Sequence, residues 1–422
     1  MVKHVLKIIW AQRKSNGWIL AELVIVMCAL WFMVDKMWVD LRCYYAPMGY
    51  DITDTWRLKL SALSPNAPGY VPDSLSGSDP TRDLLTLVER IRQEQEIAEV
   101  CVTYWSMPYA FGNSWGGVYP LDGDTAASSG KSFHMLRVGP TYFDVFRVKD
   151  KEGRTVTPLV RDAYRPTVVT AEAEEAFFKG RSAVGHKISY NDDLSDPLTI
   201  VAVLPTFRSN DFDRPENCTF SILKDDKLED MVKAFGIERA ELSVRTRRPM
   251  TEDEMYAFLE GAAERMTVNN VFVYGVTLLA DQRDTQLSFT KNENSKKLSM
   301  MAFLLANVFF GIVGTFWLRT ERRRGEIGLR VAIGSSRGKL GGLMYLEGVT
   351  LLAITLPIVL LFAFNMAFLD KLDSYREPLT LLRFAATLGL SYLLMSGMIC
   401  LGIWLPVRKA VRMAPAEALH YE

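Results

Sequence analysis

Two short motifs in the middle of the chain have spacings that enzymes use. Gly112-Asn113-Ser114-Trp115-Gly116 has the spacing of a nucleophile elbow, in which a strand precedes the serine and a helix follows it. The next residues, 117–120, are Gly-Val-Tyr-Pro, which do not favour a helix. Gly130-Lys131-Ser132 has the last residues of a phosphate-binding loop, but Thr125 stands where the leading glycine belongs. Because neither motif has the context that its chemistry needs, we predict no catalytic residue.

Metal-ligand patterns are missing from the sequence as well. No two Cys or His residues stand at the spacing of a zinc site, and Asp192, Asp193 and Asp196 are typical of turns. We therefore predict no metal ion and no cofactor in this chain. Catalytic carboxylate pairs need no local motif, so a membrane-anchored enzyme remains our third and weakest hypothesis.

Four apolar segments are long enough to cross a bilayer, which takes about 20 helical residues. We predict spans at 18–38, 298–318, 343–369 and 381–405. The first contains Glu22, which lies close enough to the end of the segment for its carboxylate to reach the interface. This segment is longer than the apolar part of a signal peptide and no small-x-small cleavage site follows it, so we predict a retained anchor.

Basic residues set the orientation of these spans. The tail 1–17, the segment 319–342 and the tail 406–422 are basic, whereas the loop 370–380 is balanced to slightly acidic. The three basic segments are predicted to lie in the cytoplasm, and residues 39–297 on the outer side. The formal net charge of zero hides this segregation, and no basic surface interleaved with aromatic residues predicts nucleic-acid binding.

The outer segment holds three of the five cysteines, Cys43, Cys101 and Cys218. Three is an odd number, so at most one disulfide can join two of them within the chain, and the pairing stays open. A disulfide framework is excluded, and cysteine usage does not identify the compartment.

The two ends of the outer segment carry the same strand–helix–strand pattern. In the first, Ile52–Leu60 and Val100–Trp105 are strand-like, and Asp79-Pro80 is typical of a helix start. In the second, Glu241–Arg245 and Asn270–Val276 are strand-like, and Thr251 with Glu254 forms a capping box between them. Two such units predict a split α/β sandwich of ferredoxin-like type, built from residues 50–106 and 240–283.

Between these units we predict an inserted second lobe, 107–239, rich in turns and short strands. Its predicted strands are Phe133–Val138, Thr167–Thr170, Leu198–Leu204 and Phe220–Leu223. Residues 284–297 contain neither glycine nor proline and lead into the second span, so they are predicted to form a stalk helix rather than a flexible linker.

The spans carry few residues that suggest more than packing. Asn307, Gly311 and Gly314 give the second span a face of small residues suited to close helix packing. Glu347 stands at the start of the third span, and Pro357 allows a kink within it. A gating role for these residues and ordinary bundle packing are both open.

The cytoplasmic segment 319–342 combines charge with helical spacing. Arg322, Glu326 and Arg330 stand four residues apart on one helical face, and each such Glu–Arg pair supports a helix by about 0.2–0.5 kcal/mol. Ile327 and Leu329 add apolar side chains. A short, rigid, charged connector of this kind is suited to receiving force from a soluble partner.

Several motifs resemble those of the MacB/FtsX-like permeases of ABC systems, the type VII family associated with mechanotransmission. The residues that carry the resemblance are Arg323-Arg324-Gly325-Glu326-Ile327-Gly328-Leu329-Arg330 in the connector, Val138–Phe146 in the outer lobe, and Pro406–Arg412 with Pro415–Leu419 at the C-terminus. The resemblance spans most of the chain and agrees with one span followed by three. It departs at Ala414 and His420, where the family often has a polar residue and Arg.

The resemblance implies an α-helical membrane protein with four spans and a large α+β periplasmic domain of porter-like type, located in a bacterial inner membrane. It also implies a dimer, with a second permease copy, and a separate ABC ATPase that binds ATP and Mg²⁺ and hydrolyses the ATP. The residues that would contact this ATPase are Arg322, Arg323, Arg324, Glu326, Ile327, Leu329 and Arg330.

Two functions are compatible with this resemblance. The leading hypothesis is efflux or extrusion of a periplasmic substrate, with a periplasmic adaptor and an outer-membrane channel as optional partners. The alternative is a non-transporting regulator that switches a periplasmic enzyme such as a cell-wall hydrolase. The sequence does not identify the substrate, and it does not distinguish a homodimer from a heterodimer.

Overall fold

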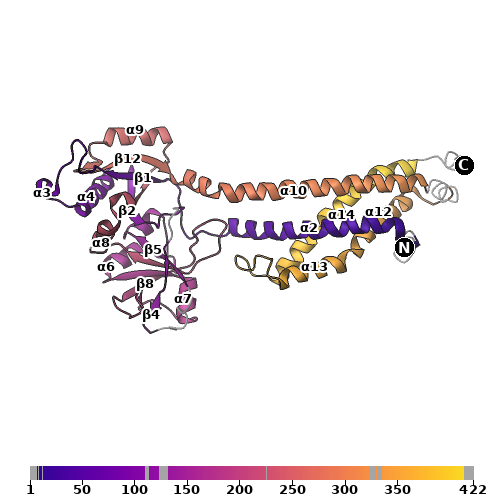
Figure 1. Cartoon of the computed structure of the whole chain (residues 1–422), viewed down its shortest axis with the longest axis horizontal. Coiled ribbons are helices and arrows are strands. Elements are labelled where there is room, and N and C mark those ends of the chain that lie inside the picture. Colours follow the sequence, from indigo (N-terminus) through magenta and orange to yellow (C-terminus); the bar gives the residue numbers. More distant parts are fainter. Residues whose placement is uncertain are drawn as a thin grey trace. The chain divides into compact units, whose positions relative to one another are not determined.

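The computed structural model describes residues 7, 9–11, 13–109, 114–122, 132–224, 226–322, 329 and 335–412. The chain forms two compact units, one of Met1–Tyr44 with Phe289–Glu422 and the other of Tyr45–Ser288. We describe each unit by itself (Figure 1).

The unit Tyr45–Ser288 is built on one twelve-stranded sheet. Its strands are β1 (Thr55–Ala62), β2 (Ile97–Tyr104), β3 (Trp115–Gly116), β4 (Tyr119–Pro120), β5 (Phe133–Val138), β6 (Pro166–Thr170), β7 (Lys187–Ser189), β8 (Leu198–Leu204), β9 (Cys218–Ile222), β10 (Ala240–Thr246), β11 (Thr267–Val268) and β12 (Val271–Leu278). Its helices are α3 (Asp73–Ser76), α4 (Pro80–Arg92), α5 (Tyr142–Val145), α6 (Thr157–Asp162), α7 (Ala171–Phe178), α8 (Asp226–Phe235), the 3-10 helix η2 (Ile237–Arg239) and α9 (Glu252–Ala262).

The first part of the sheet has the ferredoxin-like strand order that the two strand–helix–strand patterns predict. The order is β12-β1-β10-β2, with every neighbouring pair antiparallel. Leu84 and Leu87 of α4 share one buried core with Met255 and Ala262 of α9. Local capping fixes the helix starts: the Asp79 carboxylate accepts from the backbone N–H groups of residues 81 and 82, and α9 begins at the predicted capping box.

The ends of several predicted strands are shifted by local backbone conformation. The first strand begins at Thr55 rather than Ile52, because Asp54 has a left-handed φ of 54°. The second begins at Ile97 rather than Val100. It ends at Tyr104 rather than Trp105, because Trp105 has a φ of 50°. Apolar alternation locates a strand, but it does not reveal where a single left-handed residue interrupts the extended chain.

Strands from the segment between β2 and β10 continue the same sheet. β5 pairs with β2 through Thr103↔Val138 and Tyr104↔Arg137, and the order then runs β5-β9-β6-β8-β7-β4. In β6 the adjacent residues Val168 and Val169 belong to two different buried cores. Both faces of this part of the sheet are therefore covered, one by α5 and α6 and the other by α7.

The other unit is helical. Its helices are α2 (Arg13–Tyr45), α10 (Leu279–Arg322), α12 (Arg337–Ile354), α13 (Leu356–Phe368) and α14 (Leu381–Arg412), and α10 begins within the other unit. Four candidate membrane spans lie in them, Gly17–Tyr45, Leu279–Leu318, Gly338–Phe368 and Leu381–Lys409. The predicted class, four spans with a large α/β outer domain, is confirmed.

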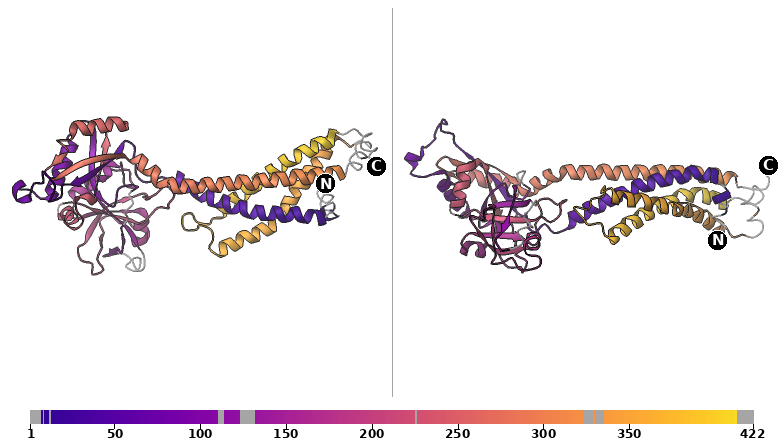
Figure 2. Two further views of the ribbon diagram at one scale, coloured as in Figure 1. Left: turned by 45° about the horizontal axis from the view of Figure 1, so that its top comes forward. Right: turned by 60° about the horizontal axis from the view of Figure 1, so that its bottom comes forward.

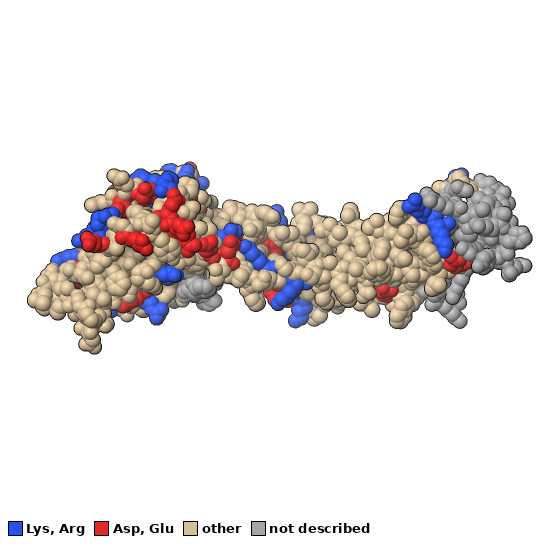
Figure 3. Space-filling model, turned by 90° about the horizontal axis from the view of Figure 1, so that it is seen from above, with Lys and Arg blue, Asp and Glu red and all other residues tan. Residues whose placement is uncertain are grey.

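The helices of this unit pack around one apolar core. Met27 and Leu30 of α2, Ile312 of α10 and Ile399 and Ile403 of α14 are all buried in it. Figure 2 shows α2 and α10 running alongside one another. On the face shown in Figure 3 the middle stretch of these helices carries few charged side chains, whereas charged residues gather toward both of its ends, as a bilayer requires.

Candidate functional site

The predicted ATPase-contact residues lie mostly outside the described residues. This holds for Arg323, Arg324, Glu326, Ile327 and Arg330. Arg322 is the last residue of α10, and Leu329 is helical and 54% exposed. The contact set therefore stays a prediction.

The predicted packing residues of the second span differ in their surroundings. A Cβ atom on Gly311 would lie 2.8 Å from Oε1 of Glu22, so α10 approaches the Glu22 side chain of α2 closely at this glycine. A Cβ on Gly314 would meet nothing within 4 Å, and Asn307 is exposed. Of the three residues, Gly311 is the one in close contact with another described span.

The third span contains the two other predicted residues. Glu347 is 3% exposed in α12. The helix ends at Ile354 and α13 begins at Leu356, with Pro357 in its first turn and Thr355 between the two helices. Proline lacks the backbone N–H that a continuous helix needs, which accounts for a boundary at this position.

Two glycines that the sequence pattern did not indicate also lie close against neighbouring helices. A Cβ on Gly348 of α12 would collide with the side chains of Ile403 and Ile399 in α14. A Cβ on Gly402 of α14 would lie 3.0 Å from Cγ2 of Ile312 in α10. Small residues allow membrane helices to approach, but sequence spacing alone did not identify the facing side chains.

A buried ion pair joins α2 to α14. Arg383 and Asp35 are 1% and 0% exposed, and Arg383 donates from Nε to Oδ1 at 2.9 Å and from Nη2 to Oδ2 at 2.6 Å. Its Nη1 donates to the carbonyl oxygens of Asp373 and Glu377. Ionisable residues within spans usually have partners of opposite charge, but the sequence does not indicate which residue is the partner of Asp35.

A second ion-pair cluster ties three elements together near the outer ends of these spans. The Asp40 carboxylate in α2 lies 2.9 Å from Nζ of Lys297 in α10 and 2.8 Å from Nη1 of Arg376 in the loop 370–380. Arg376 also pairs with Asp373 at 2.6 Å. Asp40 is 3% exposed, so this cluster is much less screened by water than a surface ion pair. We call these residues, with Asp35 and Arg383, the ionic clasp.

In the unit Tyr45–Ser288, the loop 205–217 between β8 and β9 binds the residues that follow α2 in the sequence and the first turns of α10. Arg208 is fully buried and donates from Nε to the Pro47 carbonyl at 3.0 Å. Asp211 accepts from Nε of Arg283, in the first turns of α10, at 3.0 Å and from the Tyr109 hydroxyl at 2.7 Å. A Cβ on Gly49, whose φ is +89°, would overlap the Thr206 carbonyl. We call residues 205–217 the junction loop.

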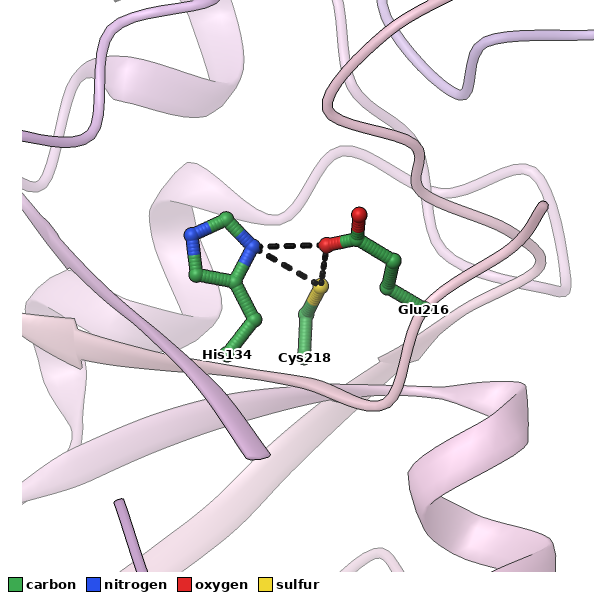
Figure 4. Close-up of side chains that lie close together, drawn as sticks. All are labelled: His134, Glu216 and Cys218. Carbon is green, nitrogen blue, oxygen red and sulfur yellow. Dashed lines mark hydrogen bonds and ion pairs between the residues drawn. The ribbon is translucent and has the colours of Figure 1, made fainter. Parts of the chain in front are cut away.

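At the end of the junction loop, His134, Glu216 and Cys218 form a buried cluster (Figure 4). His134 of β5 and Cys218 of β9 are register partners in parallel strands, so their side chains project to the same face of the sheet. Nδ1 of His134 lies 2.7 Å from Oε2 of Glu216 and 3.9 Å from Sγ of Cys218. Trp115 of β3 stacks on the imidazole at 4.8 Å.

The surroundings of this cluster disfavour ionisation of the thiol in the metal-free protein. Burial raises the pKa of Cys218 well above its ordinary value, and the nearby Glu216 and Glu172 carboxylates raise it further. A catalytic cysteine needs the opposite shift. No local sequence pattern reveals this cluster, because His134 and Glu216 are 82 residues apart in the chain.

Comparisons with known proteins give two family matches that cover most of the chain. Residues 53–254 match the MacB-like periplasmic core domain, and residues 298–415 match the FtsX-like permease C-terminal domain. No curated protein matched the chain.

Two solved structures are among the similar ones. The periplasmic region of MacB from Actinobacillus actinomycetemcomitans is 15% identical, with 56% of this chain and 94% of that chain covered and a TM-score of 0.33. The extracellular domain of the ABC-type transporter YknZ from Gram-positive bacteria is 12% identical, with 52% and 100% covered and a TM-score of 0.30. The family assignment rests on the two domain matches, which occur in the same order as the outer domain and the last three spans. The chain belongs to the MacB/FtsX-like permease family.

Proposed function

We propose that this chain is the permease subunit of an ATP-binding-cassette system in a bacterial inner membrane. In this proposal a separate cytoplasmic ATPase hydrolyses ATP and thereby moves the periplasmic domain of the permease. Membership of the MacB/FtsX-like permease family supports it, as do the four candidate spans and the large outer domain. The ATPase would dock on the connector, at Arg322–Arg324, Glu326, Ile327, Leu329 and Arg330.

The observation that carries the proposal is the length of α10. It begins at Leu279, directly after β12, and continues without a break to Arg322, a total of 44 residues. It contains no proline, and its first glycine is Gly311. An uninterrupted helix resists bending because each residue is held by a hydrogen bond to the preceding turn. A displacement of the connector would therefore be passed along α10 toward residue 279.

The ionic clasp suggests how the spans would respond to such a displacement. Asp40 holds Lys297 of α10 and Arg376 of the loop 370–380, while Asp35 holds Arg383 of α14. Three spans are therefore connected by ion pairs whose carboxylates, Asp35 and Asp40, are buried. Movement of α10 would carry these spans with it rather than slide past them.

We propose efflux or extrusion of a periplasmic substrate as the output, by a dimer with a second permease copy. The alternative output is regulation of a periplasmic enzyme such as a cell-wall hydrolase. Identifying the proteins that co-purify with the chain from native membranes distinguishes efflux from regulation. An adaptor or outer-membrane channel together with an ATPase supports efflux, a hydrolase with an ATPase supports regulation, and the absence of an ATPase contradicts both.

Two variants test the coupling itself. Asn292 is an exposed residue of α10, and Asn292→Pro removes a helical hydrogen bond at a cost of about 3 kcal/mol, which should bend the helix. We expect this variant to keep its ATPase but to lose the ATP-dependent change in hydrogen exchange over residues 45–288. Asn292→Ala is the matched control and should behave as the wild type.

The second variant, Arg330→Glu, reverses a charge in the connector and should weaken ATPase binding and coupling without affecting the fold. An Asn292→Pro variant with an unchanged ATP response would show that α10 does not transmit the motion. Unchanged complex formation and turnover in Arg330→Glu would exclude the connector as the contact.

A further inference from the structure

We propose that His134, Glu216 and Cys218 bind one divalent transition-metal ion, Zn²⁺ by the chemistry of their donors, and that the ion fixes the junction loop. This inference is independent of the proposed ATPase coupling, because metal binding is measured on the permease alone.

The three donor atoms lie close to the separations that a metal ion requires. Nδ1 and Oε2 are 2.7 Å apart, and Sγ of Cys218 lies 3.9 Å from each of them. A point in their plane that is about 2.0 Å from both Nδ1 and Oε2 is about 2.2 Å from Sγ. Zinc bonds are about 2.0–2.1 Å to nitrogen, 2.0–2.2 Å to oxygen and 2.3 Å to sulfur. Tetrahedral angles at these bond lengths put nitrogen and oxygen about 3.3 Å apart, so Nδ1 and Oε2 would separate by about 0.6 Å when the ion binds.

The arrangement fits a metal site better than a catalytic one. In a catalytic triad the nucleophile and the carboxylate contact different nitrogens of the imidazole, whereas here the thiol and the carboxylate both approach Nδ1. A set of one nitrogen, one oxygen and one sulfur donor is suited to Zn²⁺, because all three are established zinc ligands. The carboxylate makes the site less suited to Cu⁺, which prefers sulfur donors.

A fourth ligand is within reach. The Ser209 hydroxyl lies 2.9 Å from Oε2 and 3.2 Å from Nδ1. Next to it is a cavity of about 80 Å³, lined by His134, Ser209 and Asn210 among others. Since a water molecule takes about 30 Å³, this cavity can hold a water molecule that occupies the fourth coordination position of the ion. Water can also bind there to Nε2 of His134, which has no hydrogen-bond partner among the described residues.

The position of the site gives the ion a mechanical role. Ser209 and Glu216 belong to the junction loop, which binds the Pro47 carbonyl through Arg208 and binds Arg283 through Asp211. His134 belongs to the sheet, so an ion shared by His134 and Glu216 would anchor the loop to β5 and β9. With the ion bound, the loop would hold the residues next to α2 and the first turns of α10 in a fixed arrangement within this unit.

The binding test uses the full-length protein in lipid nanodiscs, purified with a tag that contains no histidine and stripped of metal by a chelator. Competition for Zn²⁺ with a chromophoric chelator should give one ion per chain. Cys218→Ser and Glu216→Gln should each lower the affinity, Cys218→Ser by more than about 100-fold, since even the loss of a residue behind the ligands costs 10–100-fold. Cys101→Ser is the matched control, a second buried cysteine that lies outside the cluster.

Co²⁺ provides a spectroscopic check of the sulfur ligand. Binding should produce a thiolate-to-cobalt charge-transfer band in the wild type and in Cys101→Ser but not in Cys218→Ser. Circular dichroism of the metal-free variants verifies the fold. Should Cys218→Ser misfold, Cys218→Ala replaces it in this comparison, since it also removes the sulfur ligand. A wild type that binds no stoichiometric Zn²⁺, or a Cys218→Ser variant with unchanged affinity, would overturn the site.

The mechanical role has its own measurement. Zn²⁺ should slow hydrogen exchange in residues 205–217 of the wild type and of Cys101→Ser, with no such effect in Glu216→Gln. Stoichiometric binding that leaves exchange in this loop unchanged would refute the role of the ion in fixing the loop.

Discussion

The pair Asp35–Arg383 allows a quantitative prediction about what holds α2 to α14. Both side chains are almost fully buried and share two charge-assisted hydrogen bonds. Removing one partner leaves the other charge buried and unpaired, which typically costs about 3–5 kcal/mol. We expect Asp35→Leu and Arg383→Met each to lower the free energy of unfolding by about 4 kcal/mol.

The double variant should cost far less than the two single variants together. It leaves no buried charge, and two apolar side chains of similar size fill the space. The remaining destabilisation of the double variant comes from the carbonyls of Asp373 and Glu377, which lose the Nη1 donor. This loss costs about 1–3 kcal/mol. The coupling energy between the two positions should therefore be at least about 3 kcal/mol.

The assay is denaturation of the full-length protein in mixed micelles by increasing amounts of SDS, followed by tryptophan fluorescence. Trp31 is a suitable reporter, because it is buried between Phe362 and Phe384. Phe384 directly follows Arg383 in the sequence. Arg42→Ala is the control. Arg42 is 62% exposed and lies 3.7 Å from Glu377, so its loss should cost less than about 1 kcal/mol. Additive single effects, or a single effect as small as that of Arg42→Ala, would refute the argument.

Two further predictions concern single positions. Gly348→Ala should destabilise the helical unit by about 1–3 kcal/mol in the same titration, because the new methyl group meets Ile399 and Ile403, whereas Gly342→Ala meets nothing and should be neutral. Burial raises the pKa of Glu241 above its ordinary value of 4.5, although hydrogen bonds partly offset the shift. The folded state therefore binds the proton more tightly, and wild-type stability falls as pH rises through the folded-state pKa. Glu241→Gln should gain stability over the wild type at neutral pH and lose this advantage below pH 4.5; a gain that does not change with pH would contradict this.

Local sequence signals predicted the elements well where the determining interactions are local. β5 and β8 have the predicted ends, and the Asp79 cap and the Thr251 capping box start α4 and α9. These signals act over a few residues, so they can be read from the chain directly. The short strands β3, β4, β7 and β11 were missed, because two or three residues carry no periodicity to detect.

The interactions that join distant parts of the chain were not predictable in this way. Asp35 and Arg383 are 348 residues apart, and His134 and Glu216 are 82 apart. Each partner by itself has an ordinary explanation, as a charge near the end of a span or as a polar residue of a turn. Their pairing depends on strand register and on the rotation of each helix about its axis, which composition does not encode.

The sequence by itself determined the four candidate membrane spans, the class of fold and the family resemblance. Hydrophobic length, basic flanks and short motifs are properties of continuous segments. Their effects on membrane insertion and on backbone conformation depend on residues that are close together in the chain. The tertiary structure alone decided which glycines allow close helix approach, which charges form the ionic clasp and which side chains converge at the junction loop. These depend on distances between segments far apart in the chain, and only packing sets those distances.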